Sequence, residues 1–141
     1  MSFFEKTKFL WDAKGAVESL IKEWEPGTLK TEAQYEKSLY DFLHDNLESI
    51  QVTKQYARGR IRADIVVNDD VIVEMKNNLD TTGKMQRLVG QLETYKKWDG
   101  SIIVLVCGTI ESNLRKELKG VIKAINDDSM DGLRASLIEK D

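Results

Sequence analysis

One stretch of the chain decides the fold: RADIVVNDDVIVEMK, residues 62–76. Two apolar runs flank the polar turn at 68–70, and this pattern predicts a β-hairpin. In such a hairpin the carboxylates of Asp64 and Glu74 come close together, and Lys76 shares a face with Glu74. Two carboxylates and an ammonium group at one place are costly unless a cation or a charged substrate joins them. The stretch therefore favours a site that binds a divalent metal and cuts a phosphodiester.

The composition predicts an intracellular protein with one compact domain. The chain has 141 residues, of which 41% are hydrophobic and 32% are charged, as is usual for a globular domain. No apolar run approaches 18 residues, which argues against a membrane span. Charged residues interrupt the first apolar residues and break any signal-peptide core, so we expect a cytoplasmic location. The single cysteine, Cys107, lies in an apolar run and is expected to be a small buried hydrophobe.

The overall charge argues against nucleic-acid binding, but its distribution does not. The net charge is −3 and the pI is about 5.3. Between Lys54 and Lys97, however, nine Lys and Arg residues face six acids. This central part carries a net positive charge, so a locally basic face on an acidic protein is expected.

Helical and strand-like patterns follow one another along the chain. The first, over residues 1 to about 24, is helical, with Phe4, Phe9, Leu10, Val17 and Ile21 among its apolar positions; Pro26 and Gly27 then break the chain. The patterns that follow predict helices over about 31–47, 82–98 and 111–126, and strands over about 50–56, 61–67, 71–76, 101–107 and 133–138. We divide the single expected domain, 1–141, into a helical extension (1–27), a core (31–107) and a C-terminal helix and tail (108–141).

These elements predict an α/β fold. An antiparallel meander of three strands, followed by a helical crossover to a fourth strand, gives a mixed sheet flanked by helices. The fourth strand, Ser101 to Cys107, is almost wholly apolar and is expected to be covered on both faces.

An acidic residue interrupts the apolar face of the helix at 31–47. Glu36 falls in the middle of the stripe formed by Leu39 and Leu43, and Glu32 falls near its edge. A carboxylate on a core-facing stripe is unusual and needs a reason. Thr28 or Thr31 is expected to cap this helix.

Four features in sequence order resemble the PD-(D/E)xK nuclease superfamily. They are Glu36 on a helix, Asp64 on a strand, Glu74-x-Lys76 on the next strand, and Gln91-x-x-x-Tyr95 on the following helix. The last motif is similar to that of the RecB-like and phage-type branches. The resemblance covers about residues 31–107 and implies a restriction-endonuclease-like αβββαβ core. The proline of the family name is absent, since Ala63 precedes Asp64.

The resemblance implies a metal-dependent nuclease that hydrolyses DNA. Asp64, Glu74 and Glu36 would hold Mg²⁺ or Mn²⁺, and Lys76 would orient the attacking water or stabilise charge on the phosphate. An electrostatic role, rather than that of a general base, suits an ammonium held near two carboxylates. Gln91 and Tyr95 would face the site and bind the substrate backbone or organise the metal ligands.

Basic side chains near these motifs are candidates for binding phosphates. They are Lys84 and Arg87 on the helix and Arg62 on the strand. Arg58 and Arg60 could act in the same way, although these arginines could equally be ordinary charges at a strand edge. No zinc finger or basic recognition helix is visible, so we expect specificity to come from DNA shape, from ends or junctions, or from a partner. A homodimer through residues 1–24, or a larger nuclease complex, is a further hypothesis.

Simpler interpretations remain open for each residue. Asp64 could form a surface salt bridge with Arg60 or Arg62, and Lys76 could be an exposed strand-end lysine. Glu36 could be a partly buried acid paired with an arginine, with Glu32 reaching the site instead. Gln91 and Tyr95 could form a polar helix edge. The alternative function is a binding or scaffold module of the same fold that is catalytically inactive or depends on a partner.

Overall fold

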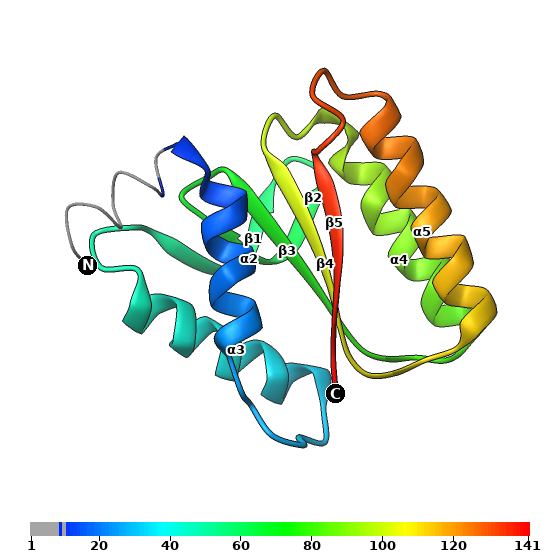
Figure 1. Ribbon diagram of the computed structural model, residues 1–141, viewed down its shortest axis with the longest axis horizontal. Coiled ribbons are helices and arrows are strands. Elements are labelled where there is room, and N and C mark those ends of the chain that lie inside the picture. Colours follow the sequence, from blue (N-terminus) through cyan, green and yellow to red (C-terminus); the bar gives the residue numbers. More distant parts are fainter. Residues whose placement is uncertain (1–8, 10) are drawn as a thin grey trace.

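A mixed five-stranded sheet lies between two pairs of helices in the computed structural model, which describes residue 9 and residues 11–141 (Figure 1). The strand order is β1-β2-β3-β4-β5. The first three strands are antiparallel, and β4 and β5 run parallel to β3. The strands are β1 Val52–Arg58, β2 Ile61–Val67, β3 Val71–Leu79, β4 Ser101–Ile110 and β5 Ala135–Lys140.

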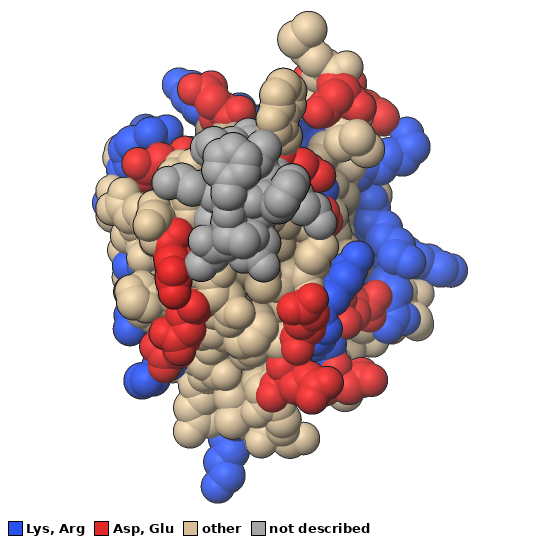
Figure 2. All heavy atoms as spheres, turned by 60° about the vertical axis from the view of Figure 1, so that its left-hand side comes forward, with Lys and Arg blue, Asp and Glu red and all other residues tan. Residues whose placement is uncertain are grey.

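Charged side chains of both signs cover the surface. On the face seen in Figure 2, Asp and Glu side chains lie in separate groups on either side of a largely uncharged middle, and Lys and Arg side chains lie mostly towards the edges. This face is therefore not uniformly basic.

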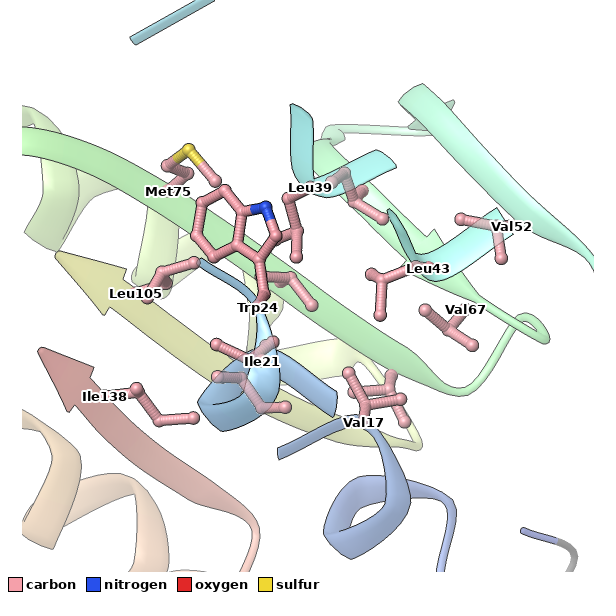
Figure 3. Packing of buried hydrophobic residues seen from close by; sticks show 14 of the residues in the cluster. Val17, Ile21, Trp24, Leu39, Leu43, Val52, Val67, Met75, Leu105 and Ile138 are labelled. Atoms are coloured by element: carbon pink, nitrogen blue, oxygen red, sulfur yellow. The ribbon is translucent and has the colours of Figure 1, made fainter. Parts of the chain in front are cut away.

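Helices α2 (Ala13–Glu23) and α3 (Glu32–Asn46) cover one face of the sheet. Figure 3 shows their apolar side chains packed against those of the strands. The fully buried members of this first core include Val17, Ile21, Leu39, Leu43, Met75 and Leu105. These positions recur every three or four residues on the helices and every second residue on the strands, as their periods require.

Helices α4 (Thr82–Thr94) and α5 (Ser112–Asp127) cover the opposite face. A short 3₁₀-helix, η1 (Tyr95–Lys97), continues α4. This second core includes the buried side chains of Ile72, Leu79, Met85, Leu88, Val104, Val106 and Leu118. Both faces of β4 are thus covered, which explains its unbroken apolar sequence and confirms the prediction.

Local sequence signals account for the ends of several elements. Thr31, rather than Thr28, caps α3, and the Gln34 side chain completes a capping box by accepting from the Thr31 backbone N–H. The β2–β3 turn places Asn68 and Asp69 in the left-handed region, with φ of 56° and 51°. Both residues tolerate this conformation, which a tight hairpin turn requires.

The predicted order of elements is confirmed, with shifts at the boundaries. The strand expected over 71–76 extends to Leu79, and the helix expected over 82–98 ends at Thr94 before η1. The single helix expected over residues 1–24 is wrong in one respect: Asp12 is not helical and instead caps α2, which runs from Ala13 to Glu23. Phe4 and Leu10 lie outside the described residues. Among the described helices, none is long and apolar enough to cross a membrane. Cys107 is fully buried, and burial raises the pKa of its thiol to about 11.

We expect Leu105→Ala to destabilise the fold strongly. Leu105 is fully buried in β4, and removing its side chain loses apolar contacts and leaves a cavity, at a cost of about 2–5 kcal/mol. Urea denaturation measures the change. Leu133→Ala is the matched control, since Leu133 is 68% exposed and its replacement should change stability by less than about 0.5 kcal/mol. Equal effects of the two substitutions would contradict the assigned core.

Candidate active site

Strands β2 and β3 separate at the point where the two candidate metal ligands lie. Their pairing extends from Val67 and Val71 to Ile65 and Val73, and β3 then continues without β2. Asp64 follows at this point, and its carboxylate accepts a hydrogen bond from the backbone N–H of Met75 at 2.8 Å. A side chain thus replaces the backbone ladder where the sheet opens, so the carboxylate of Asp64 is fixed beside β3.

In both β1 and β2 the alternation of side chains between the two sides of the sheet is interrupted at this same point. Ile65 packs in the first core, whereas Ala63 packs in the second. On β1, Tyr56, opposite Ala63, packs against the second core, whereas Val52, opposite Val67, belongs to the first. Gln55 lies at the change, with a left-handed φ of 53°. This local irregularity places Asp64, half-buried, between the two cores.

The Glu74 carboxyl group is buried beside Asp64. Its side chain is 1% exposed, and its Oε1 atom lies 2.5 Å from the hydroxyl of Tyr95. Burial, together with the negative charge of Asp64, raises the pKa of Glu74 to about 8. Two carboxyl groups of this kind cannot both ionise cheaply without a neighbouring cation.

Lys76 lies between the sheet and helix α3. Its Nζ atom is 3.5 Å from Oε2 of Glu74 and 3.8 Å from Oε1 of Glu32, and its side chain is only 17% exposed. The other oxygen of Glu32 accepts from the backbone N–H of Asn77 at 3.4 Å. Lys76 is therefore a largely buried member of the carboxylate cluster rather than an exposed strand-end lysine.

Glu36 is buried on α3, as its place in the apolar stripe predicted. It accepts a hydrogen bond from Nε2 of Gln55 at 2.6 Å, so its partner is an amide rather than an arginine. Burial raises the pKa of Glu36, and the nearby charge of Asp64 adds to this effect. Glu32 and Glu36 of α3 thus both reach the site, Glu32 at Lys76 and Glu36 at Gln55.

Gln91 and Tyr95 converge on one backbone carbonyl. Nε2 of Gln91 donates to the carbonyl oxygen of Arg62 at 2.6 Å, and the Tyr95 hydroxyl lies 2.8 Å from the same oxygen. Tyr95 is fully buried, so its position suits organisation of Glu74 rather than contact with a substrate. Gln91 is half-buried and lines a small pocket of about 130 Å³ with Asp64, Gln55 and other residues.

Among the described residues, Arg62, Lys84 and Arg87 form no salt bridge with Asp64 or Glu74. The Arg62 guanidinium donates to the carbonyls of Gly59 and Ile61 rather than pairing with Asp64. Lys84 binds Asp80 and the carbonyl of Asn78. Arg87 is exposed on α4. Arg62 lines the small pocket beside Asp64, and none of the three is part of the cluster of Asp64, Glu74 and Lys76.

The donor set fits a divalent ion that keeps several water ligands. Mg²⁺ is usually bound through one or two carboxylates together with waters and phosphate oxygens, and Asp64 and Glu74 supply two adjacent carboxylates. Over residues 9 and 11–141, no three His, Cys, Asp or Glu side chains form a preassembled metal-binding group. Glu36, expected as a third ligand or an orienting partner, holds one of its two oxygens on Gln55, and its role at a metal stays a prediction.

Gln55 is the residue of the site that the sequence analysis missed. Its side chain holds Glu36, and its backbone lies where β1 and β2 change face. A glutamine inside a polar strand carries no sequence signal for a left-handed conformation. Only the position of Gln55 opposite Asp64 in the hairpin, which follows from the strand register, would have indicated it.

Comparisons with known proteins add little to this geometry. Neither protein-family models nor curated protein sequences match the chain. Among solved structures, SfsA of Pyrococcus furiosus, in complex with Ca²⁺, is similar over 76% of this chain, with 14% sequence identity and a TM-score of 0.43. The chain spans 55% of the length of that protein. A likeness this distant carries no conclusion about activity.

The stability of the metal-free protein should fall with rising pH because of Glu74. The pKa of Glu74 is about 8 in the folded state, against its ordinary value of 4.5. Between these values the folded state holds a proton that the unfolded state has lost, so the free energy of unfolding decreases by up to about 1.4 kcal/mol per pH unit. Glu74→Gln cannot ionise and should lose this component.

Urea denaturation at pH 5, 6, 7 and 8 in the presence of EDTA measures the effect. The quantity of interest is the difference between the wild type and Glu74→Gln at each pH. Glu93→Gln is the control, because Glu93 is exposed on α4 and pairs only with Lys96 at the surface. Parallel pH curves for the wild type and Glu74→Gln would contradict the raised pKa.

Proposed function

We propose that this protein is a metal-dependent nuclease that hydrolyses phosphodiester bonds of DNA with Mg²⁺ or Mn²⁺. The observation that carries the proposal is the cluster of Asp64, Glu74 and Lys76 at the opening between β2 and β3. Glu74 is buried there beside a second carboxylate, and this raises its pKa. Perturbed acids of this kind, next to a specific charged partner, are frequent at functional sites.

Asp64 and Glu74 are the residues that would hold the ion. A bound Mg²⁺ would polarise the phosphate and lower the pKa of a bound water. The ion would also add to the positive charge of Lys76, which alone faces both Glu74 and Glu32 while Asp64 brings a further negative charge. Because Asp64 is already fixed by the Met75 N–H, only one of its two oxygens is engaged with the protein backbone, and the other is available to a ligand.

Lys76 would act on the phosphate by its charge. Its ammonium is held by Glu74 and Glu32, which orient it towards the same cluster. A fixed ammonium beside a phosphate stabilises the negative charge that develops in the transition state. Tyr95 and Gln91 would hold Glu74 and the Arg62 backbone in place, and Glu36 with Gln55 would support Asp64 from the α3 side.

A second candidate function is a binding or scaffold module of the same fold without catalysis. Two observations favour it: the chain has a net charge of −3, and no preassembled group of three ligands is present in the described part of the chain. Against it stands the buried acid pair, which destabilises a fold that gains nothing from it. The two functions differ in whether Mg²⁺ binds and whether DNA is cut.

Cleavage of labelled DNA with Mg²⁺ or Mn²⁺ tests the proposal. The substrates are linear, circular, single-stranded and branched DNA, and the readout is the fraction cut against time. We expect metal-dependent cutting by the wild type and a loss of at least about 100-fold in Lys76→Ala, because a fixed charge at the transition state is removed. The preferred substrate identifies the kind of nuclease.

Lys123→Ala is the matched control for this experiment. Lys123 is an exposed lysine on α5 that pairs with Asp127, and its replacement should leave cutting unchanged. Cutting that survives in Lys76→Ala would point to a contaminating nuclease. An absence of cutting in every substrate would favour the binding module.

Mg²⁺ should also stabilise the folded protein, and this effect should depend on Asp64. A ligand that binds only the folded state raises the free energy of unfolding by about 1.4 kcal/mol when its concentration is ten times the Kd. Thermal denaturation at pH 7.5, with Mg²⁺ or EDTA, measures the shift. Asp64→Asn should lose it, whereas Asp127→Asn, a change of the same kind on the surface of α5, should keep it.

A further inference from the structure

A basic groove lies beside the proposed active site. Residues of the β1–β2 turn, from Arg58 to Ile61, form one side, and residues of α4 and η1, from Glu93 to Lys97, form the other; the cavity between them measures about 710 Å³. We call it the hairpin groove, and its lining residues are Arg58, Gly59, Arg60, Ile61, Glu93, Thr94, Lys96 and Lys97.

The hairpin groove carries an excess of positive charge. Four of its lining side chains are cationic, and Glu93 is the one carboxylate among them. Glu93 pairs with Lys96 at 2.8 Å. Among the described residues, no acid forms a salt bridge with Arg58, Arg60 or Lys97, so these charges are available to an anion. A local surface of this kind can bind phosphates on a chain whose overall charge is negative.

The turn side of the groove is held in shape by its own contacts. Gly59 takes a φ of +60° at the first position of the two-residue turn, a conformation that glycine adopts without strain. Nη1 of Arg62 donates to the Gly59 carbonyl at 2.6 Å. The Arg58 guanidinium lies 4.8 Å from the ring centre of Trp98, which holds it by a cation–π contact. The stacked guanidinium keeps its N–H groups at its edge, where a phosphate can accept them.

The hairpin groove continues the proposed active site along two elements. Arg60 precedes Asp64 by four residues on the same hairpin, and Glu93 follows Gln91 by two residues on α4. A strand advances about 3.3 Å per residue, so Arg60, in the turn next to β2, is roughly 13 Å along the chain from Asp64. Successive phosphates of one DNA strand are about 3.4 Å apart along the helix axis, so this separation corresponds to about four nucleotides.

We propose that the hairpin groove binds the phosphate backbone of the nucleic acid that is cut, about three to six nucleotides to one side of the cleaved bond. This inference rests on the proposed nuclease function. It assigns phosphate contacts to Arg58, Arg60, Lys96 and Lys97, in addition to the basic residues nearer the carboxylates. A backbone polyanion suits a groove lined by four cationic side chains, because its charges repeat at a regular spacing.

The salt dependence of DNA binding tests the proposal. A fluorescein-labelled 30-base-pair duplex and the corresponding single strand are titrated with protein in EDTA, so that no cutting occurs, between 50 and 200 mM KCl. The variants are Arg60→Ala/Lys97→Ala in the groove and Lys37→Ala/Lys123→Ala as control. The control pair removes the same charge from exposed lysines on α3 and α5.

Each lost phosphate contact reduces the slope of log K against log [KCl] by about 0.9 for duplex DNA and about 0.7 for a single strand. We therefore expect the groove variant to lose about 1.8 from the slope with duplex DNA, or about 1.4 with single-stranded DNA. The control variant should keep the wild-type slope. A loss with either substrate supports the groove and shows which form of DNA it binds.

Two outcomes overturn the proposal. One is an equal slope for the groove variant and the wild type, and the other is a failure of the wild type to bind either DNA at 50 mM KCl. The cleavage assay separates this from failure of the nuclease function. Cutting that requires Lys76, with a slope unaffected in the groove variant, leaves the nuclease and removes the groove. A reduced slope without any cutting leaves a nucleic-acid-binding surface on a protein that is not a nuclease.

Discussion

The early end of the β2–β3 ladder is the constraint on which the site depends. Backbone groups freed where two strands separate need other partners, and side chains supply them here. The carboxylate of Asp64 accepts from the Met75 N–H, and Gln91 and Tyr95 meet the Arg62 carbonyl. The residues of the candidate site therefore also complete the sheet, so substitutions at these positions affect folding as well as any chemistry.

The single hydroxyl proton of Tyr95 couples these contacts to the charge of Glu74. The hydroxyl lies close to Glu74 and to the Arg62 carbonyl, yet it can donate to only one of them. When Glu74 is protonated, it can donate to Tyr95, and Tyr95 to the carbonyl. When Glu74 is ionised, the Tyr95 proton turns to the carboxylate, and Gln91 alone satisfies the carbonyl. Gln91 and Tyr95 can thus satisfy the Arg62 carbonyl whether Glu74 is protonated or ionised.

The features that could be predicted from the sequence are those set by hydrophobic periodicity and by turn and capping residues. The strand over 61–67, the covered strand β4 and the Thr31 cap follow from local patterns, and Asp64, Glu74 and Lys76 meet because a hairpin brings them together. The positions of Glu32 and Glu36 depend on how α3 rotates when its apolar side chains pack, which no local pattern fixes. The left-handed Gln55, likewise, follows from tertiary contacts.

The buried acids remain the strongest argument that this fold has a ligand. Apolar residues of similar size would fill the place of a buried ionic cluster at no loss of stability, and often with a gain. Lys76 offsets only part of the cost, since its one ammonium lies against both Glu74 and Glu32 while Asp64 brings a further negative charge. At neutral pH the unliganded cluster keeps a proton on Glu74. A divalent cation would replace that proton and let both carboxylates ionise, so the arrangement suits a protein whose site is complete only when a cation is bound.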